Sequence, residues 1–139
     1  MIFVPIARER IPFEWERIIG LIGQAIERDP DATPAGLYRE LVAGRAEAFW
    51  IGVPVHATGI AVTTTTDDAC FINYVAGTVE GGPRKFIQTA RDIVAEIETL
   101  ARDAGCTELR GGGRNWSRVF PEWEHYDPEH PNRIRKRLS

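Results

Sequence analysis

Residues Ala57–Arg114 read ATGIAVTTTTDDACFINYVAGTVEGGPRKFIQTARDIVAEIETLARDAGCTELRGGGR, and this stretch decides the fold. Two runs rich in Val, Ile, Thr, Phe and Tyr, Ala57–Asp67 and Ala69–Val79, meet at an Asp-Asp pair and predict a β-hairpin. A Gly-Gly-Pro turn breaks the second run, and apolar residues then recur at helical spacing until Gly105. The next residues, Cys106–Arg110, read as a strand. Because a strand, a helix and a strand in this order form a crossover, we expect the last two strands to be parallel neighbours.

The predicted helix carries one apolar stripe, which comprises Phe86, Ile87, Ala90, Ile93, Val94, Ile97, Leu100 and Ala101. Any ligand of such a crossover is expected near Gly81–Lys85, where the carboxyl end of the strand faces the helix N-terminus. Helical spacing from Pro12 to Asp29, and a Thr33-Pro34 start with a Gly44 stop, predict two earlier helices. The remaining predicted elements are strands at Met1–Ala7, Ala46–Val53 and Trp123–Tyr126, a short helix at Asn115–Phe120, and an outer strand at Arg133–Leu138.

The length of 139 residues, with 43% apolar and 27% charged residues, predicts one globular domain over residues 1–139. The net charge of −3 argues against a general nucleic-acid-binding protein, which would be strongly basic. Both cysteines, Cys70 and Cys106, fall in predicted strands and are expected to be buried thiols. No apolar run approaches the roughly 20 residues of a membrane span, and the N-terminus lacks the apolar core of a signal peptide. We therefore expect no membrane partner and no secretion by a signal peptide.

The element order β-α-α-β-β-β-α-β-α-β-β resembles the GCN5-related N-acetyltransferase (GNAT) superfamily over essentially the whole chain. It favours an α/β (α+β) fold with a mixed sheet of six to seven strands and helices on both faces. The more specific resemblance is to small GNAT-like proteins of tailed phages, where a helix ends in AR-x-x-GC and the following strand leads into a GR-x-x-W-type segment. Here Ala101–Cys106 reads ARDAGC and Gly113–Trp116 reads GRNW. The phage pattern usually has Gly-Trp where this chain has Asn115-Trp116.

In the GNAT superfamily, a Gln/Arg-x-x-Gly-x-Gly/Ala loop after the fourth strand binds the acetyl-CoA pyrophosphate through backbone N–H groups and the helix dipole. The corresponding residues here, Val79–Lys85, read VEGGPRK. Pro83 removes one donor, and Glu80 adds negative charge, so the loop departs from the pattern. An ordinary helix start, a coenzyme A site and another anion site all stay open. If acetyl-CoA binds, the resemblance implies that the cofactor-binding residues are Gly81, Gly82, Arg84 and Lys85.

The resemblance also implies a catalytic acid, often a tyrosine seven residues after the asparagine that opens the fourth helix. Counting from Asn115 gives Glu122, so this chain lacks that tyrosine. Nothing in the spacing joins the remaining acid or base candidates, which are Glu80, Tyr126, His56 and His125. The three histidines also lack the short spacings of metal ligands, so we expect no metal site.

Three successive glycines, Gly111–Gly113, follow the predicted fifth strand. In the superfamily the fourth and fifth strands separate near this point to form the cofactor cleft. The glycines either open that cleft or let Trp116 fold back on the sheet, and we favour the second reading. Nearby aromatic residues, Trp116, Phe120 and Trp123, are expected to be core or interaction residues.

The C-terminal tail concentrates basic residues in an acidic protein, at Arg133, Arg135, Lys136 and Arg137. This pattern is typical of a solvated strand face. The functional alternative is docking to an acidic protein surface, or to nucleic acid through the tail alone.

Two hypotheses follow. The first is a GNAT-fold protein that has lost acyl transfer and acts as a phage virion-associated structural or interaction protein, without a cofactor. It would be oligomeric or part of a larger assembly of phage structural proteins, in the virion or the host cytoplasm. The second is an acyl-CoA-dependent N-acetyltransferase with acetyl-CoA bound at the start of the long helix. The departures in the phosphate loop lead us to expect the first from the sequence.

Overall fold

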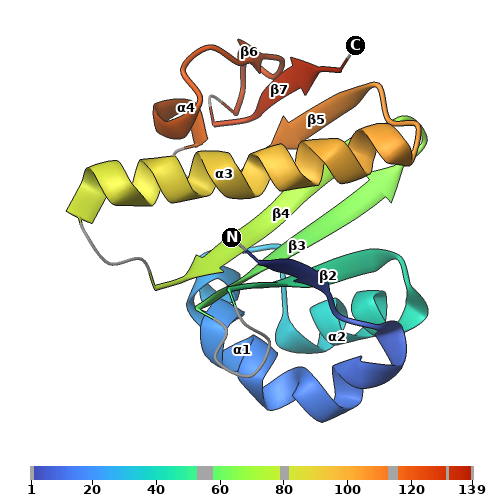
Figure 1. Cartoon of the computed structure of the whole chain (residues 1–139). Helices are drawn as coiled ribbons and strands as arrows, with labels where there is room; N and C mark the ends of the chain where they lie inside the picture. The colour runs from blue at the N-terminus through green and yellow to red at the C-terminus, as the bar shows by residue number, and fades with distance from the viewer. Residues whose placement is uncertain (1, 53–57, 79–81, 113–115, 131, 139) are drawn as a thin grey trace. The chain divides into compact units, whose positions relative to one another are not determined.

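A computed structural model of the chain describes residues 2–52, 58–78, 82–112, 116–130 and 132–138. Figure 1 shows its elements in chain order. They are β1 (Phe3–Pro5), the 3-10 helix η1 (Arg8–Arg10), α1 (Ile11–Glu27), α2 (Pro34–Ala43), β2 (Ala46–Ile51), β3 (Gly59–Thr66), β4 (Ala69–Gly77), α3 (Gly82–Asp103), β5 (Glu108–Gly111), α4 (Trp116–Val119), β6 (Glu124–His125) and β7 (Ile134–Arg137). Apart from η1, this order is the one that the sequence predicts.

The strands form a mixed sheet of seven strands, with the hydrogen-bonded order β1-β2-β3-β4-β5-β7-β6. The predicted crossover is confirmed, since β4 and β5 pair in parallel from Ala69 opposite Glu108 to Ile72 opposite Gly111. The prediction of an outer strand at Arg133–Leu138 is wrong, because β7 lies between β5 and β6. Alternating basic residues suggested an edge, but β6 pairs antiparallel with β7 along that edge, and Glu124 of β6 forms an ion pair with Arg135.

The chain divides into two compact, interleaved units. One comprises Met1–Thr64 and Tyr74–Thr78, and the other comprises Thr65–Asn73 and Val79–Ser139. Each of β3 and β4 therefore contributes residues to both units.

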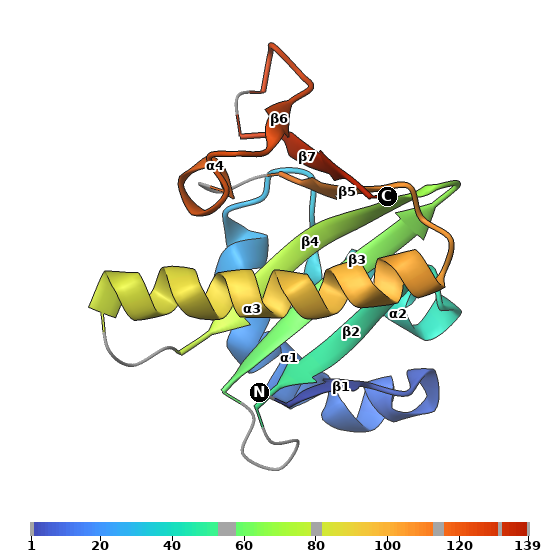
Figure 2. The ribbon, with the colours of Figure 1, turned by 45° about the horizontal axis from the view of Figure 1, so that its top comes forward.

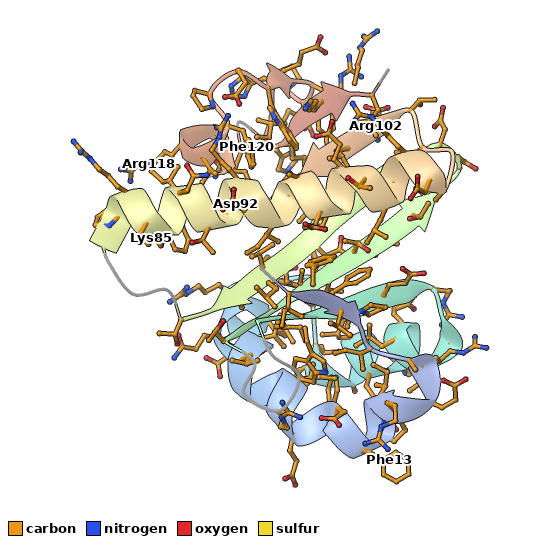
Figure 3. All side chains as sticks on the ribbon, in the orientation of Figure 1. Phe13, Lys85, Asp92, Arg102, Arg118 and Phe120 are labelled. Carbon is orange, nitrogen blue, oxygen red and sulfur yellow. The ribbon has the colours of Figure 1, made fainter. Side chains whose placement is uncertain are left out.

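The core of the first unit forms where α1 and α2 bury their apolar stripes. Buried residues of this core come from α1, α2, β2 and β3, and include Ile18, Ile22, Ile26, Leu41, Trp50, Ile60 and Val62. As predicted, Thr33 caps α2, because its Oγ1 accepts a 3.0 Å hydrogen bond from the N–H of Gly36. Gly44 ends α2 in the left-handed conformation at φ +77°. By contrast, Phe13 on α1 is 76% exposed and projects into solvent (Figure 3).

The second unit is built on the long helix α3 and the strands β5 and β7. Lys136 on β7 forms an ion pair with Glu98 on α3, so Lys136 and its register partner Leu109 mark the sheet face that α3 covers. Both predicted buried thiols, Cys70 and Cys106, are buried and do not form a disulfide. Figures 1 and 2 both show α4 beside α3 and β7 beside β5. The face that carries Leu109 is therefore packed, whereas Glu108 and Arg110 point to the opposite face.

Candidate functional site

The first turns of α3 are open to solvent. Gly82 begins the helix at φ +82°, and every residue from Gly82 to Gln88 is exposed. Figure 3 labels Lys85 at this end of the helix, and both Lys85 and its neighbour Arg84 are exposed. The predicted site residues Glu80 and Gly81, and His56, lie outside the described residues. The structure thus places three of the four predicted cofactor-binding residues on one exposed helical turn.

The apolar stripe of α3 is buried along only part of its length. Ala90, Ile93, Val94, Ile97 and Ala101 are buried, as predicted. At the N-terminal end, however, Phe86 is 54% exposed and Ile87 is 37% exposed, and Leu100 near the other end is also exposed. The sequence predicted one apolar face along the whole helix, and helical spacing alone does not show which residues of such a face are covered. Two large apolar side chains are consequently left beside Arg84 and Lys85.

The parallel pairing of β4 with β5 stops early. The last pair is Ile72 opposite Gly111, whereas β4 continues to Gly77. A Cβ atom at Gly111 would lie 3.4 Å from the indole of Trp116, so Trp116 folds back on the end of β5. At Gly112, a Cβ atom would lie 3.5 Å from Cγ of Arg133. These contacts favour the second of the two predicted roles for the glycines, namely room for Trp116 at the point where the paired region ends.

Three aromatic rings stack beyond this point and are tied to α3 by one arginine. The ring of Phe120 lies 6.0 Å from that of Trp116 and 4.5 Å from that of Trp123. Phe120 and Trp123 are buried. Arg91 of α3 places its guanidinium 5.0 Å from the Phe120 ring centre and donates hydrogen bonds to the Val119 carbonyl at 2.6 Å and to Glu122. The last bond holds the pKa of Glu122 below its usual value. The sequence analysis missed Arg91, because its partners Val119 and Glu122 are far away along the chain and no local pattern indicates these contacts.

The four basic tail residues are all paired with carboxylates. Arg133 bonds to Asp127 at 2.8 Å, and Lys136 to Glu98 at 2.9 Å. Glu124 accepts from Arg135 at 3.0 Å and has Arg137 at 3.8 Å. The tail thus forms part of the sheet and its charges are largely balanced within the second unit. Docking of an acidic partner to these residues stays a prediction. Fewer of their positive charges are left without a carboxylate partner than the sequence suggests.

Tyr126, which the sequence analysis named as a catalytic candidate, lies against Arg110 on β5. The Arg110 guanidinium carbon is 5.2 Å from the ring centres of both Tyr126 and Phe71. Since Phe71 and Arg110 are register partners, both lie on the sheet face opposite α3. The structure therefore does not bring Tyr126 together with the exposed turn of α3. His125, the other described candidate, is an exposed residue of β6.

A possible cation-binding group of side chains occurs in the loop before β7. Ligand atoms of Asp127, Glu129 and His130 lie within 4.8 Å of one another. However, one oxygen of Asp127 already accepts bonds from Nδ1 of His130 at 3.0 Å and from Arg133 at 2.8 Å. Arg133 thus occupies the carboxylate oxygen that a metal ion would need. We therefore describe this group as an ion-paired turn and assign no metal to it.

Comparison with known proteins identifies the fold. No protein-family model matches the chain, and no curated protein sequence matches it. Among solved structures, the GCN5 of Tetrahymena has a TM-score of 0.70 at 7% identity, covering 100% of this chain and 97% of that one. An aminoglycoside 6'-acetyltransferase of type Ii has a TM-score of 0.68 at 13% identity, covering 97% and 94%. An IAA acetyltransferase from Bacillus cereus has a TM-score of 0.65 at 11% identity, covering 99% of each chain. The chain thus has the GNAT fold, and the tailed-phage resemblance stays a prediction.

A membrane-spanning helix is not found in the described part of the chain, where none of the helices is both long and apolar enough.

Proposed function

We propose that this chain, which has the GNAT fold, binds an acyl-CoA at the start of α3 and transfers the acyl group to an amine. One observation carries the proposal. The apolar stripe of α3 continues to Phe86 and Ile87, where both side chains are exposed next to the cations Arg84 and Lys85. Apolar and basic side chains together on one exposed turn suit a ligand with an aliphatic arm and a diphosphate.

The backbone of this turn supports the same ligand. The N–H groups of Gly82 and Arg84 lie in the first turn of α3, where backbone donors have no partners within a helix. Pro83 between them supplies no donor, which is the departure from the family pattern noted above. A helix of 22 residues still places the positive end of its dipole at this point. Two donors, two cations and the dipole therefore remain for a diphosphate.

Transfer would form a bond between the acceptor nitrogen and the acyl carbon and break the carbon–sulfur bond. The amine loses a proton and the departing thiolate gains one.

A second candidate is binding without transfer, as in a structural or interaction protein. It is favoured by the position of Tyr126, whose ring packs on Arg110 on the sheet face opposite α3. The predicted virion-associated role, with phage structural proteins as partners, belongs to this candidate. The two candidates differ in one measurable property, the release of free thiol.

A thiol-release assay separates the candidates. The protein is incubated with acetyl-CoA and a panel of primary amines, and free coenzyme A is measured over time. We expect release that depends on the amine and that falls at least tenfold in the double variant Arg84→Ala/Lys85→Ala, since this variant removes both cations of the proposed diphosphate site. Arg102→Ala, which removes an exposed arginine near the other end of α3, is the matched control and keeps full activity. Binding of acetyl-CoA without any amine-dependent release would favour the second candidate.

A further inference from the structure

The solvent side of α1 carries a large apolar side chain. Phe13 is 76% exposed (Figure 3), more than the other large apolar residues that the structure describes. The guanidinium of Arg10 lies 5.2 Å from the centre of its ring and leaves most of the ring open to solvent. Because an α-helix has about 3.6 residues per turn, Gly20 and Gln24 lie on the same side as Phe13, and both are exposed. We call Phe13, Gly20 and Gln24 the outer line of α1.

The glycine on this line is not required by anything in the described part of the chain. A Cβ atom at Gly20 would meet nothing within 4 Å, and Gly20 does not have a positive φ. Glycine in the middle of a helix is less favourable than alanine, because its backbone loses more conformational freedom on folding. A glycine on a helix surface does, however, allow a second backbone to approach closely. The open position beside Phe13 therefore suits contact with another molecule.

The two flanks of the outer line carry charges of opposite sign. Glu-Arg pairs recur at residues 9–10, 16–17 and 27–28, with spacings of seven and eleven residues. Both spacings are close to whole numbers of helical turns, so the three glutamates lie along one flank and the three arginines along the other. Glu14 lies beyond the arginines and pairs with Arg10 at 3.2 Å and with Arg17 at 2.7 Å. With Glu14 counted, the residues from Glu9 to Arg28 place three negative charges on the glutamate flank and a net two positive charges on the arginine flank.

We infer that the outer line of α1 binds a second copy of this chain, with the two α1 helices side by side and parallel about a two-fold axis. A two-fold axis along the helices turns the glutamate flank of each copy toward the arginine flank of the other. In an antiparallel pair each flank would meet its own like charges, so the charges select the parallel arrangement.

The same pairing accounts for the apolar side chain and the glycine. A two-fold interface uses the same patch on both copies, and this patch complements itself because it supplies both signs of charge. The two Phe13 rings leave water by packing on each other, and Gly20 lets the two backbones approach closely. The inference does not depend on the proposed function, because α1 contains none of the residues assigned to acyl-CoA.

Sedimentation equilibrium of the full chain, without coenzyme A and at low salt, tests the inference. We expect a reversible monomer–dimer equilibrium with a dissociation constant of roughly 10–500 μM, because one helix face forms a small interface. Phe13→Ser should weaken dimerisation at least about tenfold, since it removes the largest apolar contact. Leu100→Ser is the matched control, because Leu100 is 43% exposed on α3, and it should leave the dissociation constant unchanged. A wild-type chain that stays monomeric at about 1 mM overturns the inference, and so does an equal effect of the two variants.

A charge exchange tests the partner and its orientation. Glu27 and Arg28 are exposed and form no ion pair among the residues that the structure describes. Glu27→Lys and Arg28→Glu each place like charges opposite one another in the parallel pair and should weaken dimerisation at least about threefold. The double variant Glu27→Lys/Arg28→Glu exchanges the signs on both flanks, so it should dimerise as tightly as the wild type. Single variants without effect, or a double variant as weak as either single one, overturn the parallel pairing of two copies.

Discussion

The guanidinium of Arg91 lies over the ring of Phe120, 5.0 Å from its centre, and thereby joins α3 to the segment that follows α4. The same side chain donates to the Val119 carbonyl at the end of α4 and to Glu122, so one residue makes three contacts with α4 and the segment after it. Phe120 is the middle ring of the stack that includes Trp116, and Trp116 rests on Gly111 at the end of β5. Arg91 is therefore the link between the long helix and the place where the paired part of β5 ends.

Replacing Arg91 should loosen this link. Arg91→Gln removes a cation–π contact and two hydrogen bonds, and we expect it to lower the free energy of unfolding by about 1–2 kcal/mol. Arg102→Gln is the matched control, because Arg102 is similarly exposed on the same helix and makes an i,i+4 ion pair with Glu98. It should cost less than about 0.5 kcal/mol. Urea denaturation followed by tryptophan fluorescence measures both, and equal losses would contradict the role given to Arg91.

The pair between Arg91 and Glu122 should make stability depend on pH in the acid range. The hydrogen bond from Arg91 lowers the pKa of Glu122 from its usual 4.5 in the folded chain. Because the pKa is lower in the folded chain, ionised Glu122 stabilises the fold above pH 4.5. This stabilisation is lost as the pH falls through the folded-state pKa. The difference in urea midpoint between the wild type and Glu122→Gln should thus be largest near neutral pH and shrink below pH 4.5. A difference that stays constant down to pH 3 would show that the charge on Glu122 is not involved.

Tyr74 should control stability in the alkaline range. Burial, aided by its 3.0 Å hydrogen bond to Asp29, raises the pKa of Tyr74 from 10.0 to about 12. Because the pKa is higher in the folded chain, the protonated Tyr74 hydroxyl contributes its full stabilisation below pH 10. This stabilisation is lost as the pH rises through about 12. Tyr74→Phe loses the hydrogen bond and should lower the free energy of unfolding by about 1 kcal/mol near neutral pH. Denaturation curves of both proteins should converge as pH approaches 12, and a gap that widens instead would contradict this assignment.

Gly77 should not tolerate a side chain. Its φ is +147°, and a Cβ atom there would clash with the Thr58 carbonyl oxygen and with Cα of Gly59. Gly77→Ala should therefore destabilise the protein by about 1–3 kcal/mol. Gly20 in α1 is the matched control, because a Cβ atom there meets nothing within 4 Å. Gly20→Ala should stabilise by about 0.5–1 kcal/mol through its better helix propensity. Thermal unfolding of the two variants tests this, and a Gly77→Ala protein as stable as the wild type would refute the close approach.

The sequence predicts the elements well because their signals are local. Thr33 and Gly44 bound α2, the aspartate pair forms the hairpin turn, and the crossover rule places β5 beside β4. The position of β7 was mispredicted, since the alternation of basic and apolar residues within a strand does not show which other segment pairs with it, here Glu124–His125 of β6. Arg91 and Arg110 were missed for a related reason. Their roles come from rings far away along the chain, Phe120 for Arg91 and Phe71 for Arg110, and spacing in sequence does not contain such contacts.

Calorimetric titration with acetyl-CoA is the most direct test of the claim that the exposed first turn of α3 binds an acyl-CoA. The account predicts a saturable isotherm with a dissociation constant in the micromolar range, weakened at least tenfold by Arg84→Ala/Lys85→Ala and unchanged by Arg102→Ala. An absence of binding heat up to millimolar acetyl-CoA at two temperatures, or an isotherm that the double variant leaves unchanged, would contradict it.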